Sequence, residues 1–238
     1  MDNIVEFRVT GRYALFTDPL TKVGGEKFSY QIPTYEALKG ILSSVYWKPT
    51  IIWVIDKVRV MKPIRTETRS ARPVKYGGGN DLSIYTYLSD VEYQVQARFE
   101  WSPHRRDLAQ DRNENKHYFI AKRMIERGGR RDVFLGTREC QGYVEPCEFA
   151  SGGGFYDNYP GEMSFGLMFH GFDYPDELGK NEFHARFWHP KMVKGVVEFI
   201  RPEKCVIRKF VRQMTADPPR SIGLMEEGLL EGYEEGGV

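Results

Sequence analysis

The sequence has only three cysteines among its 238 residues and no hydrophobic run long enough to cross a membrane. The longest apolar run, residues 51–55, has the length of a strand, whereas a membrane helix needs roughly 18 such residues. Cys140, Cys147 and Cys205 are odd in number and irregularly spaced, which argues against a disulfide framework. No signal-peptide pattern opens the chain. We therefore expect a soluble, cytoplasmic protein with no membrane partner.

The short motifs of nucleotide and metal chemistry are also missing. There is no Walker loop, no Rossmann glycine pattern, no metalloprotease helix and no Cys-x-x-Cys pair. His184 and His189 precede Cys205, but their spacing matches no zinc site. We expect the protein to use neither a metal nor a cofactor.

The charge is unevenly distributed, although the formal net charge is only +1. Five glutamates and no lysine or arginine follow Arg220, so the rest of the chain is basic. Residues 57–75 and 104–131 concentrate the positive charge, and many aromatic residues lie among them. Such clusters usually cover a solvated face, but two of them with aromatics favour a polyanion such as RNA. The predicted RNA contacts are Arg65, Arg69, Arg72, Arg105 and Arg106.

Hydrophobic periodicity predicts the order βαββαβ in the first 150 residues. A first helix follows the Pro33-Thr34 cap, and a second, whose apolar stripe is Phe119, Met124 and Ile125, ends at Gly128-Gly129. A basic, glycine-rich segment at 67–85 should form a flexible hairpin tip. The predicted strands are 3–10, 50–66, 90–101, 132–135 and 142–149, and the second helix is 112–127.

This order is typical of a ferredoxin-like domain, so we predict an α+β protein. Residues 1–150 would form that domain, residues 151–218 a smaller β-rich C-terminal unit, and residues 219–238 a disordered acidic tail. The expected C-terminal strands are 162–172, 183–189, 192–200 and 204–212.

Lys116-His117 is the most suggestive pair of reactive residues. A histidine can give or take a proton at neutral pH, and a neighbouring ammonium can stabilise a phosphate, which suits metal-free RNA cleavage. Such a dipeptide more often lies on the surface without a function. Tyr46, at the end of the first helix, could likewise have only a packing role there. We expect the two helices to run parallel, which would place Tyr46 and Lys116-His117 at opposite ends of the sheet.

Two segments resemble a known family. Residues 28–42, continuing through Val45-Tyr46-Trp47-Lys48-Pro49, and the run Phe134-Leu135-Gly136-Thr137-Arg138-Glu139-Cys140 are similar to the CRISPR-associated Cas-five family, in its subtype I-C branch (Cas-five-d). The chain departs from the usual Thr-Pro-Ser-Ala-Ala-Arg-Gly of that branch, with Thr34-Tyr35-Glu36-Ala37-Leu38-Lys39-Gly40 in its place.

The resemblance implies a metal-independent endoribonuclease whose catalytic residues are Tyr46, Lys116 and His117. It would cleave precursor CRISPR RNA at the base of the repeat hairpin through the 2′-hydroxyl. It would then hold the 5′ handle of the mature crRNA in a type I-C effector complex, beside the backbone and large subunits. A non-catalytic, handle-binding subunit is the alternative. A generic RNA-recognition module is a weaker one, since no RNP pattern is present.

Overall fold

The computed structural model describes residues 3–19, 21 and 25–215. The predicted acidic tail, residues 219–238, lies outside this part of the chain. Within the described residues, no helix is long and apolar enough to cross a membrane.

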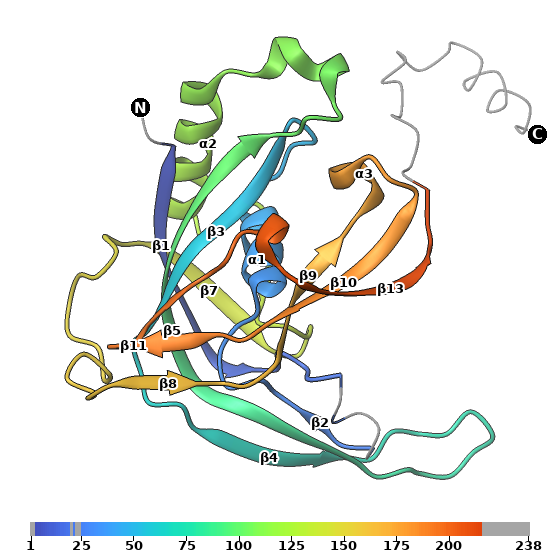
Figure 1. The fold of residues 1–238 in the computed structure, drawn as a ribbon. Helices are drawn as coiled ribbons and strands as arrows, with labels where there is room; N and C mark the ends of the chain where they lie inside the picture. Colours follow the sequence, from blue (N-terminus) through green and yellow to red (C-terminus); the bar gives the residue numbers. More distant parts are fainter. Residues whose placement is uncertain (1–2, 20, 22–24, 216–238) are drawn as a thin grey trace, which may run out of the picture.

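The centre of the molecule is an antiparallel sheet with the strand order β7-β1-β5-β3. Numbered among themselves, these four strands have the order 4-1-3-2. Helix α1 connects the first to the second, and helix α2 connects the third to the fourth (Figure 1). This is the ferredoxin-like arrangement, and it confirms the predicted α+β class. The elements concerned are β1 (Ile4–Ala14), α1 (Tyr35–Val45), β3 (Ile51–Val60), β5 (Ser83–Trp101), α2 (Glu114–Glu126) and β7 (Gln141–Pro146).

Local sequence explains the two helices. Thr34 caps α1, because its hydroxyl accepts a hydrogen bond from the Ala37 amide at 3.1 Å. Asn113 caps α2 in the same way through the Lys116 amide at 3.0 Å. The buried residues of α2 are His117, Ala121 and Ile125, spaced by four. The predicted stripe was therefore partly wrong.

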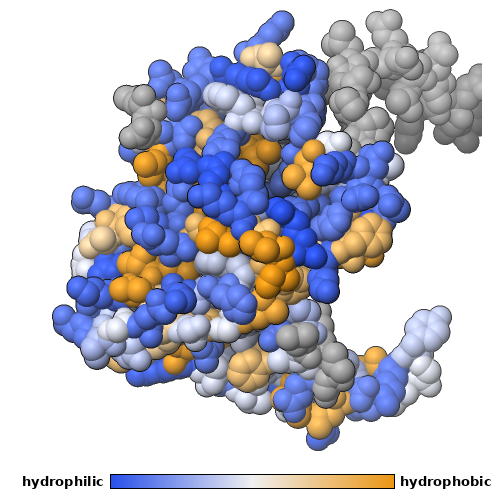
Figure 2. Space-filling view, viewed as in Figure 1, coloured by the Kyte–Doolittle hydropathy of each residue, from blue (hydrophilic) through white to orange (hydrophobic). Residues whose placement is uncertain are grey.

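The predicted glycine-rich loop is more ordered than its composition indicates. Strand β4 (Thr66–Ala71) pairs with residues 83–88 of β5, so the strand predicted at 90–101 begins seven residues earlier. The short β2 (Lys27–Phe28) adds a parallel pair to the same part of β5. The resulting hairpin projects from the body of the molecule (Figures 1 and 2). A hairpin tip was predicted within residues 67–85, and Val74 and Asn80 pair across it, whereas the ordered strands on either side of the tip were not predicted.

The C-terminal half contributes to two sheets. Strands β12, β11 and β8 extend the central sheet beyond β3, where Val58 pairs with Val197. Strands β13, β10 and β9 form a separate three-stranded sheet. The boundary at residues 150/151 stays a prediction. The bounds are β6 (Val133–Phe134), β8 (Glu162–Ser164), β9 (Met168–Asp173), α3 (Pro175–Leu178), β10 (Glu182–Trp188), β11 (Lys191–Val193), β12 (Val196–Glu198), η3 (Pro202–Lys204) and β13 (Ile207–Gln213).

Buried charges join the three-stranded sheet to α1. Arg186 and Asp173 form a buried ion pair between β10 and β9. The Glu36 carboxylate of α1 accepts a hydrogen bond from the Phe172 amide at 3.1 Å. Burial raises the pKa of Glu36, while Lys39 opposes that rise. The second sheet is thus held against the helix that leads to Tyr46.

Two glycines allow a matched test of the backbone geometry. Gly136 has φ 97°, and an added Cβ would overlap the Leu15 carbonyl oxygen. Gly40 lies inside α1, where an added Cβ meets no atom within 4 Å. We predict that Gly136→Ala lowers the free energy of unfolding by about 2–4 kcal/mol, from strain and overlap. Gly40→Ala should raise it by up to about 1 kcal/mol. Urea denaturation measures both, and equal stabilities would contradict this geometry.

Candidate active site

The fold brings the end of α1 and the start of α2 to the same edge of the sheet. Helix α1 leads into the start of β3, and α2 follows the end of β5, while Ile51 of β3 pairs with Trp101 of β5. Because these two strands are antiparallel neighbours, the two helices run in opposite directions. The expectation of parallel helices was therefore wrong, and no distortion is needed for Tyr46 to approach Lys116-His117.

Tyr46 and His117 are in direct contact. The Tyr46 hydroxyl oxygen lies 2.7 Å from His117 Nδ1. Tyr46 is the residue after α1, where the backbone turns extended (φ −155°, ψ 126°), and its carbonyl accepts a 2.7 Å hydrogen bond from Trp53 Nε1. Tyr46 is 3% exposed and His117 is 0% exposed. The hydrogen-bonded pair is thus enclosed by protein.

The surroundings of the imidazole fix its tautomer. His117 Nε2 lies 2.8 Å from the carbonyl oxygen of Asp111, which can only accept, so Nε2 carries the proton. In the neutral ring Nδ1 is then the acceptor, and the Tyr46 hydroxyl donates to it. The rings of Phe99 and Trp101 meet the imidazole edge-on, with centroids 6.1 and 5.6 Å away.

Burial governs the protonation of Tyr46. It raises the pKa of this phenol to about 12, with the nearby Asp111 carboxylate as a smaller cause. The hydroxyl is therefore protonated at neutral pH, as its donor role requires. Tyr46 can give up its proton only to a base that is already in contact with it, and His117 Nδ1 is that base.

Asp111 connects Lys116 to this pair. Its Oδ1 lies 2.5 Å from Lys116 Nζ, and its Oδ2 accepts a 2.7 Å hydrogen bond from Thr50. These bonds, with that from Lys116 as the larger cause, lower the pKa of Asp111, so the carboxylate is ionised at neutral pH. The Lys116 side chain is 48% exposed, so its ammonium lies where solvent can reach it.

Asp111 was absent from the sequence-predicted site. It ends the 3₁₀ helix η2 (Arg106–Asp111), two residues before the Asn113 cap. Its only signal in the sequence is a carboxylate inside a basic window, which does not distinguish it from Asp107. Asp107 pairs instead with Arg105 at 2.8 Å.

The five predicted RNA-binding arginines fall into two separate groups. Arg105 and Arg106 lie at η2, beside the start of α2. Arg65, Arg69 and Arg72 lie along the hairpin of β4 and β5, at the opposite end of the molecule in Figure 1. Arg69 pairs with Tyr85, and the rest of β5 runs on to Trp101, about 50 Å of extended strand at roughly 3.3 Å per residue. The structure therefore does not unite the two groups in one patch.

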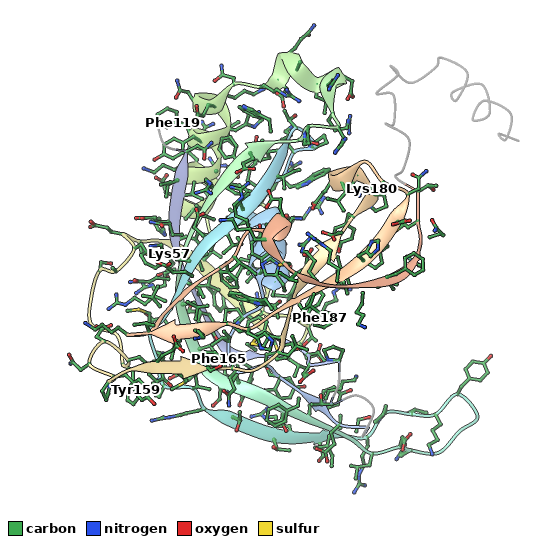
Figure 3. The ribbon with its side chains drawn as sticks, viewed as in Figure 1. Lys57, Phe119, Tyr159, Phe165, Lys180 and Phe187 are labelled. Atoms are coloured by element: carbon green, nitrogen blue, oxygen red, sulfur yellow. The ribbon has the colours of Figure 1, made fainter. Side chains whose placement is uncertain are left out.

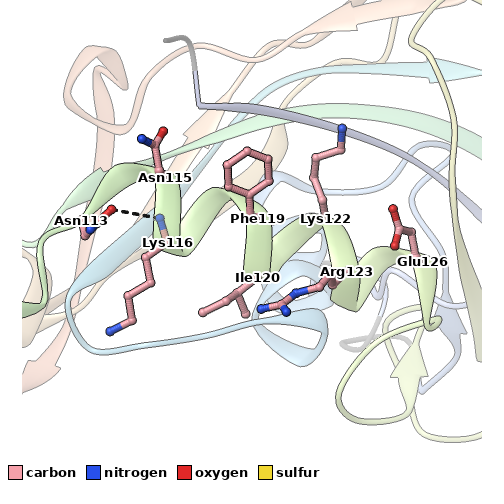
Figure 4. Close-up of a pocket in the computed structure, with 8 residues that line it drawn as sticks. All are labelled: Asn113, Asn115, Lys116, Phe119, Ile120, Lys122, Arg123 and Glu126. Atoms are coloured by element: carbon pink, nitrogen blue, oxygen red, sulfur yellow. Dashed lines mark hydrogen bonds between the residues drawn. The ribbon is translucent and has the colours of Figure 1, made fainter.

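The exposed side of α2 carries basic and aromatic residues next to Lys116. Phe119 is 52% exposed and points away from the sheet (Figure 3). A shallow groove of about 660 Å³ follows this helix face (Figure 4). Its lining residues are Asn113, Asn115, Lys116, Phe119, Ile120, Lys122, Arg123 and Glu126. The sequence analysis placed Phe119 in the apolar stripe of the second helix, and so it did not predict this residue on the exposed face beside Lys116.

Metal-binding side chains do not gather at this site or elsewhere in the described chain. Across residues 3–19, 21 and 25–215, no group of three or more His, Cys, Asp or Glu side chains could hold a metal ion. At the site, His117 is hydrogen-bonded to Tyr46 and to the Asp111 carbonyl, and the Asp111 carboxylate is bonded to Thr50 and Lys116. Lys116 contributes a cation. The arrangement suits proton transfer and phosphate binding.

The Tyr46–His117 bond should contribute measurably to stability. Tyr46→Phe leaves Nδ1 buried without its donor, and we predict a loss of about 1–3 kcal/mol in the free energy of unfolding. Tyr143→Phe is the matched control, because Tyr143 is 59% exposed, and its effect should be near zero. Equal unfolding midpoints for the two variants in urea would show that the buried bond contributes nothing.

Comparison with known proteins places the chain in a family. The family model of CRISPR-associated proteins described as Cas_Cas5, in its Cas5d form, matches residues 4–200. A protein of Mannheimia succiniciproducens named "CRISPR pre-crRNA endoribonuclease Cas5d" is 30% identical, over 83% of this chain and 95% of that protein. A protein of Thermus thermophilus with the same name is 28% identical, over 69% of this chain and 73% of its own length.

Solved structures agree with this placement. A crystal structure of a CRISPR-associated protein superposes with a TM-score of 0.75 at 36% identity, covering 87% of this chain and 97% of the other. The functionally uncharacterized protein SMU1763c of Streptococcus mutans gives a TM-score of 0.73 at 37% identity, with the same coverage. With the family model matching most of its length, the chain belongs to the Cas5d family of CRISPR-associated proteins.

Proposed function

We propose that this protein is a metal-independent endoribonuclease that cleaves precursor CRISPR RNA at the base of the repeat hairpin. The observation that carries the proposal is the contact between Tyr46 and His117, beside the Lys116 ammonium. Support also comes from the two relatives named pre-crRNA endoribonucleases. The three proposed catalytic residues come from two helix ends, and the fold gathers them at one edge of the sheet.

In the proposed reaction the 2′-hydroxyl oxygen attacks the neighbouring phosphorus. A bond from O2′ to phosphorus forms, the bond from phosphorus to the 5′ oxygen breaks, and a 2′,3′-cyclic phosphate and a 5′-hydroxyl result. The Tyr46 oxygen takes the 2′ proton while its own proton passes to His117 Nδ1. Lys116 stabilises the charge of the phosphorane and of the departing 5′ oxygen. The 5′ oxygen takes a proton from water, and His117 releases its extra proton to solvent, so that no net proton is gained or lost.

A second candidate function is a non-catalytic subunit that only holds the RNA handle. The burial of His117 and Tyr46 favours it, because neither side chain is open to solvent in this structure. The two candidates differ in one measurable property, cleavage of a cognate repeat RNA by the purified protein. Under either one, the mature crRNA and the other type I-C effector subunits are the proposed partners.

The two groups of arginines would serve different parts of the RNA. Arg105 and Arg106 lie at the start of η2, which ends at Asp111, and would hold phosphates near the scissile bond. Arg65, Arg69 and Arg72 would contact RNA on the projecting hairpin. Arg69 already lies 4.4 Å from the Tyr13 ring centroid and pairs with Glu67, so part of its charge is balanced.

The cleavage chemistry can be tested with the protein's own repeat RNA. Cleavage should proceed unchanged in EDTA, because Tyr46, Lys116 and His117 supply the proton transfer and charge stabilisation. A 2′-deoxy substitution before the cut should abolish it, since that hydroxyl is the nucleophile. Dependence on added magnesium, or cleavage of the deoxy substrate, would refute the mechanism.

Single variants separate the proposed roles within that same reaction. His117→Ala should slow single-turnover cleavage at least about 100-fold while RNA affinity stays nearly intact. Lys116→Ala should lower both rate and affinity, because an ammonium binds phosphate in the ground state as well. Tyr46→Phe should slow cleavage strongly without changing affinity. A near-normal rate for Tyr46→Phe would make this tyrosine purely structural.

The two arginine groups should differ in what their removal impairs. Arg105→Ala/Arg106→Ala should weaken RNA binding and flatten its dependence on salt, by about one unit of slope for each phosphate that the variant leaves without a cation. It should also slow cleavage. The triple replacement of Arg65, Arg69 and Arg72 by alanine should weaken binding but leave the rate at saturating RNA unchanged. Filter binding across a salt series measures this, and an unchanged slope in both variants would place the RNA elsewhere.

A further inference from the structure

The proposed catalytic pair is closed to substrate in this structure. Both nitrogens of the His117 ring are hydrogen-bonded within the protein, and the ring is 0% exposed. A ribose 2′-hydroxyl cannot reach Tyr46 or His117 unless something moves. Residues 102–113, which contain η2, connect β5 to α2 and supply the group that covers His117 Nε2.

The covering segment is weakly attached to the body. No residue of η2 is buried, and Leu108 breaks the helical geometry with φ −100° and ψ 18°. Arg112 donates a 2.8 Å hydrogen bond to the carbonyl of Ser102, which is buried and whose amide donates to the Thr50 carbonyl at 2.9 Å. The segment is therefore anchored at its first residue, whereas η2 beyond it is not buried. A segment with so little buried surface can open locally without unfolding the sheet.

Asp111 makes the contacts that hold this segment shut. Its carboxylate bridges Lys116 of α2 and Thr50 at the start of β3, and its carbonyl oxygen accepts from His117. The Lys116 partner is half exposed, and ion pairs of that kind stabilise little in water. One residue therefore connects the cover to α2, which carries Lys116 and His117, and to Thr50 just before β3.

We propose that η2 is a gate over the active site, that Asp111 is its latch, and that RNA opens it. A phosphate of the RNA takes the place of the Asp111 carboxylate on Lys116, while Arg105 and Arg106 on the gate bind neighbouring phosphates. The displaced segment uncovers Tyr46 and His117. The consequence for RNA cleavage rests on the proposed function, whereas the gate itself does not.

Two features of the site support RNA as the occupant. The latch is an anion held by Lys116, and a phosphate is the anion that a basic surface selects. The gate also carries Arg105 and Arg106 at its start, so that a polyanion bound to them acts on the gate directly. Because the closed state cannot accept substrate, the apparent affinity for RNA is reduced by the fraction of molecules that are open.

Chemical labelling of the full-length, RNA-free protein tests the gate. Diethyl pyrocarbonate modifies accessible histidines, and peptide mass spectrometry reports each rate. His104 is exposed and His170 is 0% exposed, so they provide the fast and slow references. We expect His117 to react about as slowly as His170 in the wild type and about tenfold faster in Asp111→Asn. Thr50→Val, which removes one of the hydrogen bonds to the latch, should give a smaller increase.

The matched control is Glu114→Gln, which removes a carboxylate in the first turn of α2 outside the latch. It should label like the wild type. Wild-type His117 reacting as fast as His104 would refute the closed site. Equal rates for Asp111→Asn, Glu114→Gln and the wild type would refute the latch.

Single-turnover cleavage of the protein's own repeat RNA across a series of protein concentrations gives the second readout. Asp111→Asn should lower the half-saturating protein concentration about three- to tenfold, whereas Glu114→Gln should change it by less than twofold. An unchanged half-saturating concentration in Asp111→Asn would overturn the role of RNA in opening the gate. If the wild type cleaves nothing while labelling behaves as expected, the gate stands and the proposed function fails.

Discussion

The antiparallel pairing of the start of β3 with the end of β5 is the constraint on which the site depends. It places the exit of α1 beside the entry of α2, and so it brings Tyr46 to His117. The same edge supplies the walls of the site, because Phe99 and Trp101 belong to the last residues of β5 and flank the imidazole. A change in strand register there would move both helices and both walls together.

Sequence patterns predicted those parts of the fold that depend on local interactions. The alternation of Val5, Phe7 and Val9 in the strand predicted at 3–10 and the Thr34 cap each act within a few residues, and the strand order followed from the elements they define. The hairpin tip within residues 67–85 was predicted, but β4 was not, because its side chains are almost all exposed and so lack the apolar alternation of a half-buried strand. The predicted parallel direction of α1 and α2 was wrong, because α1 leads into β3 and α2 leaves β5, and these two strands are antiparallel.

The site was less predictable, because its residues meet only in the folded chain. His117 occupies a core position of α2, and periodicity assigned that face to Phe119 and Met124 instead. A buried histidine is stable there only because Tyr46 and the Asp111 carbonyl satisfy both ring nitrogens. Asp111 could not be predicted at all, because nothing in the sequence distinguishes one carboxylate in a basic window from another until its partners are known.

Enclosure and access make opposite demands on such a site. A buried imidazole with two fixed hydrogen bonds has one tautomer and one orientation, which favours proton transfer in a defined direction. The same enclosure excludes the substrate, so a permanently closed site could only be structural.

Here the two demands fall on different parts of the chain. The walls come from the rigid sheet, while the cover over Nε2 comes from η2, which buries no side chain. Because Lys116 is held by that cover rather than by the sheet, the cation that would bind a phosphate is also the one whose release loosens the cover. Substrate binding and exposure of the Tyr46–His117 pair are thereby coupled through Asp111.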